Sequence, residues 1–484
     1  MNHAVVLVLG DLGRSPRMQY HAYSLAEMHS SSVGSHSSKQ WKVSVIGYEG
    51  ENVINVLSEH PYVSIYRLTV WDFPFLKIIS LVHALSKGIL LFINVFCQLL
   101  RLPTYQFIII QNPPCLPALA AAILVSWLNG SKIMIDWHNL GFAMFQDRLG
   151  PTHLLVLFAK LLECVLVSFA SYHICVSQAM KHWLLENFRV RATVLYDRPP
   201  SLFKDRAMSS KDRHQLLLRL GYTTEKLFRF DSHMHVADLV ERTIQTVATC
   251  DHGDKRTHYS MRTNGVHSSA GGRVGLVMSC TSWTPDEDFN LLLRALLIVE
   301  EHLQNHSDGR AIRGYDRLAV VITGKGPMKA AFETAVKEYA AQGRLNRRVA
   351  VRTAWLSHED YPALLRCADL GISLHTSTSG LDLPMKVLDM FGSAVPVCAF
   401  SFPTLPELVQ DGVNGLVFTD SFQLAAQIIR LLIDPNGIDG EATGTPQREL
   451  MMLGQGAACI TSWEENWATN MRPILIDAFP SSFL

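Results

Sequence analysis

Residues 4–28, AVVLVLGDLGRSPRMQYHAYSLAEM, decide the fold class of this chain. The opening run AVVLVLG is apolar and far shorter than a bilayer span, so it predicts a buried strand. A glycine-containing loop follows at residues 10–17, and residues 18–28 are helical in pattern. A strand, a glycine turn and a helix in this order open a doubly wound α/β domain. We expect no signal peptide, because the strand begins almost at the first residue.

Apolar runs continue to alternate with helical stretches along the chain. The strands expected in the first half are residues 41–46, 107–110, 132–135 and 172–176. Those expected in the second half are residues 275–279, 318–322, 349–352, 370–374 and 395–399. The helices expected there are residues 289–304, 328–341, 360–367 and 386–391. This alternation predicts parallel βαβ units, and hence an α/β protein with two Rossmann-like, doubly wound domains.

The domain boundaries follow from shifts in composition. Residues 1–203 form the first predicted domain and residues 273–455 the second, with a cleft between them. Residues 204–272 are a polar insertion, in which runs such as SSKDRH and CDHGDKRTH predict partial disorder. Residues 456–484 form a C-terminal helical segment. A chain of 484 residues is long enough for this organisation and a large core.

The charge and cysteine content exclude some classes of function. The chain has 43 basic and 43 acidic residues, so no overall positive field would recruit nucleic acid. None of the nine cysteines forms a CxxC pair, and most lie in apolar runs. Reduced thiols in a chain that faces the cytosol are therefore expected.

The composition also indicates contact with a membrane. Hydrophobic residues make up 48% of the chain, charged residues 18%, and the mean hydropathy is +0.14. Residues 76–100 are mostly apolar, and His83, Lys87, Asn94 and Gln98 fall within an arc of roughly 60° on a helix. Such a helix can span a bilayer, lie in its interface or pack on protein; we expect it to associate with a membrane. A second apolar run, residues 115–128, is too short to span.

The segment STSGLDLPMKVLDMFGSAVPV, residues 377–397, carries the clearest functional pattern. Asp382 and Asp389 lie seven positions apart, Lys386 lies between them, and Gly380 is in the preceding loop. Backbone N–H groups and a cation suit a diphosphate, and a carboxylate suits sugar or ribose hydroxyls. The segment therefore predicts a sugar-nucleotide site. The alternative is a surface loop before an ordinary amphipathic helix.

Two other loops follow strands of the second half. In ITGKGP, residues 322–327, Gly324 and Gly326 let the backbone approach an anion, and Lys325 adds positive charge. In the other loop the hydroxyl and N–H groups of Thr281, Ser282 and Trp283 can face a diphosphate. The alternatives are a tight βα turn for the first loop and a helix N-cap at Thr284 for the second.

In the first half, IDWHN at residues 135–139 ends a strand, where doubly wound sheets bind ligands. His138 can act as a base or bind phosphate, and Asp136 can orient it; the alternative is a structural His–Asp pair. The loop after the first strand is a second candidate anion site, suited to an acceptor phosphate. Its candidate residues are Gly13, Arg14, Ser15 and Arg17, and the alternative is a solvated arginine pair.

No histidine or carboxylate pattern makes a convincing metal site. Asp286, Glu287 and Asp288 have DxD spacing but follow Pro285, where acids in a first helical turn complement the helix dipole. We predict a transferase that needs neither metal nor cofactor. Lysine, arginine and backbone N–H groups would stabilise its nucleotide leaving group.

Six segments, taken in order, resemble the mannosyltransferases of the dolichol pathway, which have the GT-B fold. They are GDLGRSPRMQYHA (10–22), QNPP (111–114), IDWHN (135–139), TSWTPDEDF (281–289), ITGKGP (322–327) and SGLDLPMKVLDMFG (379–392). The resemblance covers nearly the whole chain except residues 204–272. It implies transfer of mannose from GDP-mannose to dolichyl-diphosphate-linked chitobiose, as a β1,4 linkage with inversion. One general base would deprotonate the acceptor hydroxyl.

The resemblance also assigns roles to residues and a location. Asp389 matches the acid that grips the donor ribose, Asp382 and Lys386 line the donor sugar and diphosphate, and Gly324 and Gly326 approach the phosphates. The expected location is the cytosolic face of the endoplasmic reticulum membrane, and the expected partners include other dolichol-pathway glycosyltransferases. Family members begin with a hydrophobic anchor that we do not find here, so residues 76–100 would contribute more to attachment. The alternatives are another GT-B transferase or epimerase, or a silent scaffold.

Overall fold

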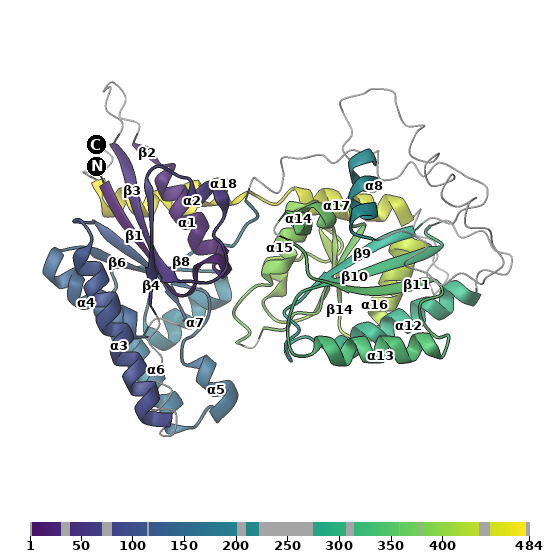
Figure 1. The fold of residues 1–484 in the computed structure, drawn as a ribbon, viewed down its shortest axis with the longest axis horizontal. Coiled ribbons are helices and arrows are strands. Elements are labelled where there is room, and N and C mark those ends of the chain that lie inside the picture. Colours follow the sequence, from purple (N-terminus) through teal and green to yellow (C-terminus); the bar gives the residue numbers. More distant parts are fainter. Residues whose placement is uncertain are drawn as a thin grey trace. The chain divides into compact units, whose positions relative to one another are not determined.

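A computed structural model describes residues 2–30, 39–69, 80–113, 116–200, 210–221, 274–305, 314–357, 359–377, 379–434 and 446–480. The chain divides into two compact units. The first contains Met1–Asp197, Leu381–Leu383 and Trp463–Leu484, and the second contains Arg198–Gly380 and Pro384–Ser462. Each unit is built on its own sheet flanked by helices (Figure 1).

The first unit contains an eight-stranded sheet in the order β2-β3-β1-β5-β6-β7-β8, with β4 also paired to β3. All pairs are parallel except β2 with β3. The strands are β1 (Asn2–Asp11), β2 (His29–Ser30), β3 (Lys39–Tyr48), β4 (Val63–Leu68), β5 (Phe107–Asn112), β6 (Lys132–Trp137), β7 (Tyr172–Cys175) and β8 (Thr193–Val194). The helical elements are η1 (Leu12–Arg14), α1 (Pro16–Ala26), α2 (Asn55–Ser58), α3 (Ser80–Arg101), α4 (Leu116–Asn129), α5 (Ala143–Leu149), α6 (Leu154–Val167), α7 (Gln178–Phe188), α18 (Trp463–Asn470) and α19 (Arg472–Ala478).

Strand β1 is a continuous apolar run because helices cover both faces of its sheet. Val5 and Leu7 face a core formed with α3, α4, α6 and α7. Val6 and Val8 face a second core, formed with α1, α2, α18 and α19. The C-terminal helices therefore complete the first unit, and α18 packs beside α1 (Figure 1). The sequence had indicated only a separate helical segment there.

The second unit has a six-stranded parallel sheet in the order β11-β10-β9-β12-β13-β14. Its strands are β9 (Val274–Cys280), β10 (Arg317–Thr323), β11 (Val349–Ala354), β12 (Leu370–Ser373), β13 (Val397–Phe400) and β14 (Gly415–Phe418). Its helical elements are α8 (Ser210–Arg219), α12 (Phe289–Asn305), α13 (Lys329–Ala341), α14 (Asp360–Leu365), α15 (Met385–Gly392), η4 (Leu405–Glu407), α16 (Ser421–Ile428), η5 (Ile429–Ile433) and α17 (Pro446–Ala458). The strand order reverses between β9 and β12, where doubly wound sheets bind ligands.

The predicted fold class is confirmed, and every predicted strand overlaps an observed one. Strands β2, β4, β8 and β14 and helix α6 were not predicted. Of the insertion at residues 204–272, the structure describes only 210–221, so its predicted disorder lies outside the described residues. Among the described residues, no helix is both long enough and apolar enough to cross a membrane. Helix α3 buries Val95 and Leu99 in the core of the first unit and exposes Ile89 and Ile93.

Candidate active site

Two loops at the carboxyl ends of β9 and β10 touch through their backbones. Gly324 has a φ of +140°, and a Cβ atom there would lie 1.8 Å from the carbonyl oxygen of Thr281. A Cβ atom on Gly326 would lie 2.0 Å from the carbonyl oxygen of Ser282. Only glycine fits so close an approach. The glycine motif thus brings the two predicted diphosphate-binding loops together.

The buried carboxylate of Glu287 connects three of the predicted donor residues. The Nζ atom of Lys386 lies 3.1 Å from its Oε1, and the N–H of Ser282 donates to Oε2 over 3.3 Å. The hydroxyl of Thr281 also donates to Oε2. Glu287 is only 2% exposed, so Lys386 supplies the cation that a buried carboxylate requires.

Sequence reasoning missed Glu287 by treating it as one of three acids at a helix start. That interpretation holds for Asp288, whose Oδ1 accepts from the N–H groups of Asn290 and Leu291 at the start of α12. Glu287 instead lies outside the helix and forms an antiparallel bridge with His375. Its position could have indicated this separate role, because α12 begins two residues later, at Phe289.

Asp389 lies one turn after Lys386 on α15, and its environment changes its acidity. Burial raises the pKa of Asp389 to about 6, although a hydrogen bond from Tyr361 and the charge of Lys386 oppose this. The Tyr361 hydroxyl donates to Oδ2 of Asp389 over 2.8 Å. At neutral pH Asp389 is therefore mostly ionised and can accept hydrogen bonds from sugar hydroxyls.

The other predicted donor residues have more varied environments. The Trp283 ring is fully buried and stacks on Phe289 at 4.5 Å, so it anchors the loop and does not face a ligand. The backbone N–H of Trp283 donates to Oγ1 of Thr281 over 2.8 Å. Lys325 is exposed, and its Nζ lies 3.9 Å from the ring centroid of Trp355.

The predicted residues Gly380 and Asp382 fall in different units. Gly380, with φ +70°, ends a segment of the second unit, and its carbonyl accepts from the Thr404 hydroxyl. Asp382 lies in the segment Leu381–Leu383, which belongs to the first unit. The carbonyl of Leu381 accepts a hydrogen bond from the Ser177 hydroxyl at the start of α7.

In the first unit, Asp136 is the centre of a buried charge network at the end of β6. It is fully buried and accepts from Arg17 through both oxygens, over 2.7 and 2.9 Å. His138 Nε2 lies 3.0 Å and His21 Nε2 3.2 Å from its Oδ2. Burial alone would raise the pKa of Asp136, but Arg17 and His138 hold it well below its usual value. Asp136 is therefore a permanent anion at neutral pH.

His138 combines a fixed orientation with access to solvent. Its side chain is 24% exposed, while Asp136 is inaccessible. With Nε2 donating to Asp136, the Nδ1 atom carries the lone pair that can accept a proton. The structure therefore brings together the two residues predicted to act as a base and its orienting carboxylate.

The four residues predicted to bind an acceptor anion lie in different environments. Arg17 is 2% exposed, and its remaining nitrogen, Nη1, donates to Asp197 over 2.8 Å. Its guanidinium is occupied by two carboxylates and is closed to an acceptor phosphate. Arg14 remains 69% exposed, 3.3 Å from Glu51. Ser15 donates its hydroxyl to the Asp11 carbonyl, and a Cβ atom on Gly13 would lie 2.3 Å from the Glu51 carbonyl oxygen.

Sequence reasoning also missed the C-terminal partners of this network. Trp467 donates its Nε1–H to Nδ1 of His21 over 3.1 Å, which leaves the proton of neutral His21 on the nitrogen facing Asp136. The guanidinium carbon of Arg17 lies 5.5 Å from the ring centroid of Trp463. These contacts join positions more than 400 residues apart, and no local pattern in the sequence indicates them.

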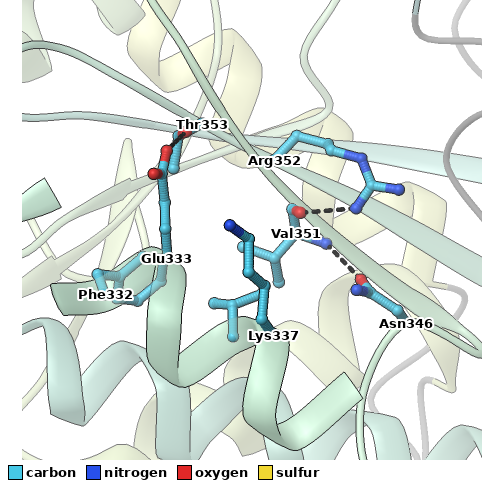
Figure 2. Close-up of a pocket in the computed structure, with 8 residues that line it drawn as sticks. Phe332, Glu333, Lys337, Asn346, Val351, Arg352 and Thr353 are labelled. Carbon is cyan, nitrogen blue, oxygen red and sulfur yellow. Dashed lines mark hydrogen bonds between the residues drawn. The ribbon is translucent and has the colours of Figure 1, made fainter. Parts of the chain in front are cut away.

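Figure 2 shows a separate hollow between α13 and β11 in the second unit, of about 310 Å³. Glu333 and Thr353 are hydrogen-bonded on one side of it, and Lys337 extends between the helix and the strand. No predicted site residue lines this hollow. Over the described part of the chain, no cluster of three or more histidines, cysteines or carboxylates could hold a metal ion.

Comparison with known proteins first defines the class. Residues 287–434 match the family model "Glycosyl transferases group 1". The fold is similar to that of Anabaena HepE solved with UDP, at a TM-score of 0.56 and 14% identity, covering 99% of this chain and 100% of that one. It is also similar to sucrose-phosphate synthase from Thermosynechococcus elongatus, at a TM-score of 0.57, 12% identity and the same coverage. The chain is a glycosyltransferase of GT-B fold.

Relatives of higher identity define the family. The chain is 37% identical to chitobiosyldiphosphodolichol beta-mannosyltransferase of Homo sapiens, covering 98% of this chain and 93% of the relative. The Mus musculus protein of the same name is also 37% identical, covering 98% of this chain and 89% of the relative. UDP-glycosyltransferase TURAN of Arabidopsis thaliana is 37% identical, covering 96% of this chain and 95% of the relative. The chain belongs to the chitobiosyldiphosphodolichol beta-mannosyltransferase family, which confirms the resemblance seen in its motifs.

Proposed function

We propose that the chain transfers mannose from GDP-mannose to dolichyl-diphosphate chitobiose, forming a β1,4 linkage with inversion. The observation that carries the proposal is the 37% identity over 98% of the chain to a mannosyltransferase whose name specifies this acceptor. We place the reaction at the cytosolic face of the endoplasmic reticulum membrane, where a dolichol-linked acceptor would lie.

The donor would bind at the carboxyl ends of β9, β10 and β12. Lys386 is held beside the loop of Thr281 and Ser282 by Glu287, so its charge is already placed for the diphosphate. Asp389 supplies an ionised carboxylate for ribose hydroxyls. This chemistry needs no metal, because lysine and backbone N–H groups can stabilise the departing GDP.

The acceptor hydroxyl would be activated by His138. As the acceptor O4 attacks the anomeric carbon, its proton passes to Nδ1 of His138, and the bond to the GDP oxygen breaks on the opposite side. A single displacement of an α-linked donor gives the β product. Asp136, 3.0 Å from Nε2, orients the ring and stabilises its protonated form.

A second candidate is a transferase that uses a UDP-sugar, which the name of UDP-glycosyltransferase TURAN favours. A catalytically silent scaffold is less well supported, because Lys386, Glu287 and Asp389 together form an intact polar site.

The deciding experiment gives purified protein a chitobiosyl-diphosphate lipid with GDP-mannose or with UDP-sugars, each with and without a chelator. We expect β-mannosylated product from GDP-mannose in both conditions, with the product sensitive to β-mannosidase. Transfer only from a UDP-sugar would support the second candidate. Loss of activity with chelator, restored by magnesium, would contradict metal independence.

A further inference from the structure

Helix α6 is apolar on the side that faces away from the protein. Its buried residues are Val156, Ala159, Glu163 and Val167, whose spacing places them on one face. The opposite side exposes Leu154 by 80%, Leu155 by 53%, Leu157 by 50%, Phe158 by 61%, Leu161 by 62% and Val165 by 48%. A helix against water carries polar residues on its outer face, so this apolar face indicates a different environment.

Neighbouring helices extend the apolar face of α6. Helices α4 and α5 both pack against α6, on the same side of the first unit (Figure 1). At the end of α4, Trp127 and Leu128 are 65% and 70% exposed, and Trp127 meets Phe169 edge to face at 5.7 Å. On α5, Phe145 is 48% exposed. We call the exposed apolar residues of α4, α5 and α6 the α6 patch.

The charges around the α6 patch indicate which surface would cover it. Helices α3, α4 and α6 contain a single acidic residue, Glu163, and it is buried on the inner face of α6. The same helices carry Lys87, Arg101 and Lys160. Helix α5 adds one acid and one base, Asp147 and Arg148, so the charges of the four helices are mostly basic. An apolar face whose neighbouring charges are mostly basic complements a phospholipid surface, in which apolar chains lie beneath phosphate groups.

We propose that the α6 patch docks on a lipid bilayer, with α6 lying in the plane of the interface. Its 14 residues span about 21 Å, too short to cross the hydrocarbon core. The inference deepens the proposed function, because a dolichol-linked acceptor is reached from the membrane surface. It moves the expected attachment from residues 76–100 to a helix that the sequence did not single out.

Glu163, on the inner face of α6, holds the loop that follows His138. Oε1 of Glu163 accepts from Asn112 Nδ2 over 2.7 Å and from the Gly141 N–H over 2.9 Å, while Oε2 accepts from the Phe142 N–H over 3.0 Å. Gly141 and Phe142 closely follow His138. One helix diameter, about 10 Å, therefore separates the proposed lipid surface from the loop that carries the proposed base.

The first test is flotation of the full chain with vesicles of phosphatidylcholine and phosphatidylinositol. The patch variant carries Leu154→Glu and Leu161→Glu, two outward positions whose substitution leaves the core intact. The control carries Phe422→Glu and Met452→Glu, which are 72% and 56% exposed in the second unit. We expect the patch variant to lose vesicle partitioning ten-fold or more and the control to bind like the unmodified chain.

Three outcomes would overturn the docking proposal. The first is that the unmodified chain does not float with the vesicles, and the second is that the patch variant floats as well as the control. The third is that size exclusion shows a dimer of the unmodified chain, which the patch substitutions dissociate without reducing vesicle binding. As a second measurement, lipids brominated on their acyl chains should quench tryptophan fluorescence, and Trp127→Phe should remove part of that quenching. An unchanged quenching profile would also count against docking.

The failure of docking is distinguishable from failure of the proposed reaction. With GDP-mannose, the patch variant should keep its rate on a short-chain, water-soluble acceptor and lose at least ten-fold on the long-chain acceptor in vesicles. Equal losses on both acceptors would contradict a role in reaching lipid. If the unmodified chain floats through the patch but mannosylates neither acceptor, the docking inference stands and the proposed function falls.

Discussion

The ammonium of Lys386 lies 3.1 Å from the buried carboxylate of Glu287. Among the described residues, Glu287 is the only acidic residue that forms an ion pair with Lys386. Glu287 is 2% exposed, so the pair is partly desolvated and each member depends on the other. Because Glu287 also binds the loop of Thr281 and Ser282, it fixes the distance between the cation and the loop backbone.

Removing the charge of Glu287, Lys386 or Asp389 should impair the use of the donor. We expect Glu287→Gln, Lys386→Ala and Asp389→Ala each to lower kcat/KM for GDP-mannose by about ten-fold or more, roughly 1.4 kcal/mol. The double variant of Glu287 and Lys386 should lose less than the sum of the single losses, because they act as one pair. Asp288→Asn is the matched control, since asparagine can still cap α12. Kinetics equal to the control in all three variants would exclude this site.

The raised pKa of Asp389 predicts a pH-dependent effect on stability. Burial raises its pKa from 3.8 to about 6, so the folded protein keeps a proton that the unfolded chain releases in that range. Its contribution to stability is full below the unfolded pKa and is lost as pH rises through the folded pKa. Asp389→Asn cannot ionise. Its unfolding free energy, relative to the unmodified chain, should therefore rise by on the order of 2 kcal/mol between about pH 4 and pH 7.5.

Urea unfolding of both proteins across this pH range measures the difference, and other titrating groups cancel in the comparison. A difference in unfolding free energy that does not change with pH would show that the Asp389 carboxyl has an ordinary pKa in the folded state.

The contact between the two donor loops predicts a large effect at Gly324. A methyl group there would lie 1.8 Å from the Thr281 carbonyl oxygen at a φ of +140°, so Gly324→Ala must move a loop. We expect a loss of more than about 3 kcal/mol in unfolding free energy. Gly412→Ala is the control, because Gly412 has φ +75° and open space around it, and should lose only about 1 kcal/mol. Equal losses would mean that the loops do not depend on close contact.

Much of the fold could be predicted because strands buried on both faces, such as β1 and β10, are continuous apolar runs. Strand β4, VSIYRL, was missed because its polar and half-buried residues lack such a run. Helix α6, LLVLFAKLLECVLV, was missed because it is apolar on its inner and outer faces and shows no helical periodicity. The fold could therefore be predicted from the sequence where an element is buried on all sides as a strand, and not where its residues are half-buried or apolar on both faces.

The candidate site was predictable only where its residues lie close together in the sequence. Asp136 with His138, and Lys386 with Asp389, were recognised within their own segments. The role of Arg17 was not, because it is set by Asp136, 119 positions away. Arg17 lies on α1 and points inward, whereas Arg14 precedes the helix and stays exposed, a difference that their three-residue spacing does not show.

The geometry of His138 predicts a loss in kcat without a loss in donor binding. His138→Ala removes the proton acceptor, and kcat should fall by about 10²- to 10⁴-fold while KM for GDP-mannose stays nearly constant. Added imidazole should restore part of the rate. If the variant only lowers the melting temperature and kcat is unchanged, His138 and Asp136 form a structural pair.

The last prediction concerns Glu163, which positions the loop after His138. In Glu163→Gln an NH₂ group replaces one oxygen and must face an N–H donor, because Oε1 and Oε2 both accept backbone hydrogen bonds. The loop should shift by a fraction of an ångström, enough to misplace the proposed base. We expect kcat to fall about ten-fold with KM for the donor unchanged, since the donor site lies in the other unit.

A merely structural role for Glu163 would move a different quantity. If Glu163→Gln reduced only the amount of folded protein, the molecules that do fold would keep the kcat of the unmodified chain. The apparent loss of activity would then disappear after correction for the folded fraction. Glu186→Gln on α7 is the matched control, because Glu186 is an exposed carboxylate in the same unit. It should leave both kcat and melting temperature unchanged. A kcat for Glu163→Gln equal to that of the control would show that the hydrogen bonds from Gly141 and Phe142 hold the fold but do not set the position of His138.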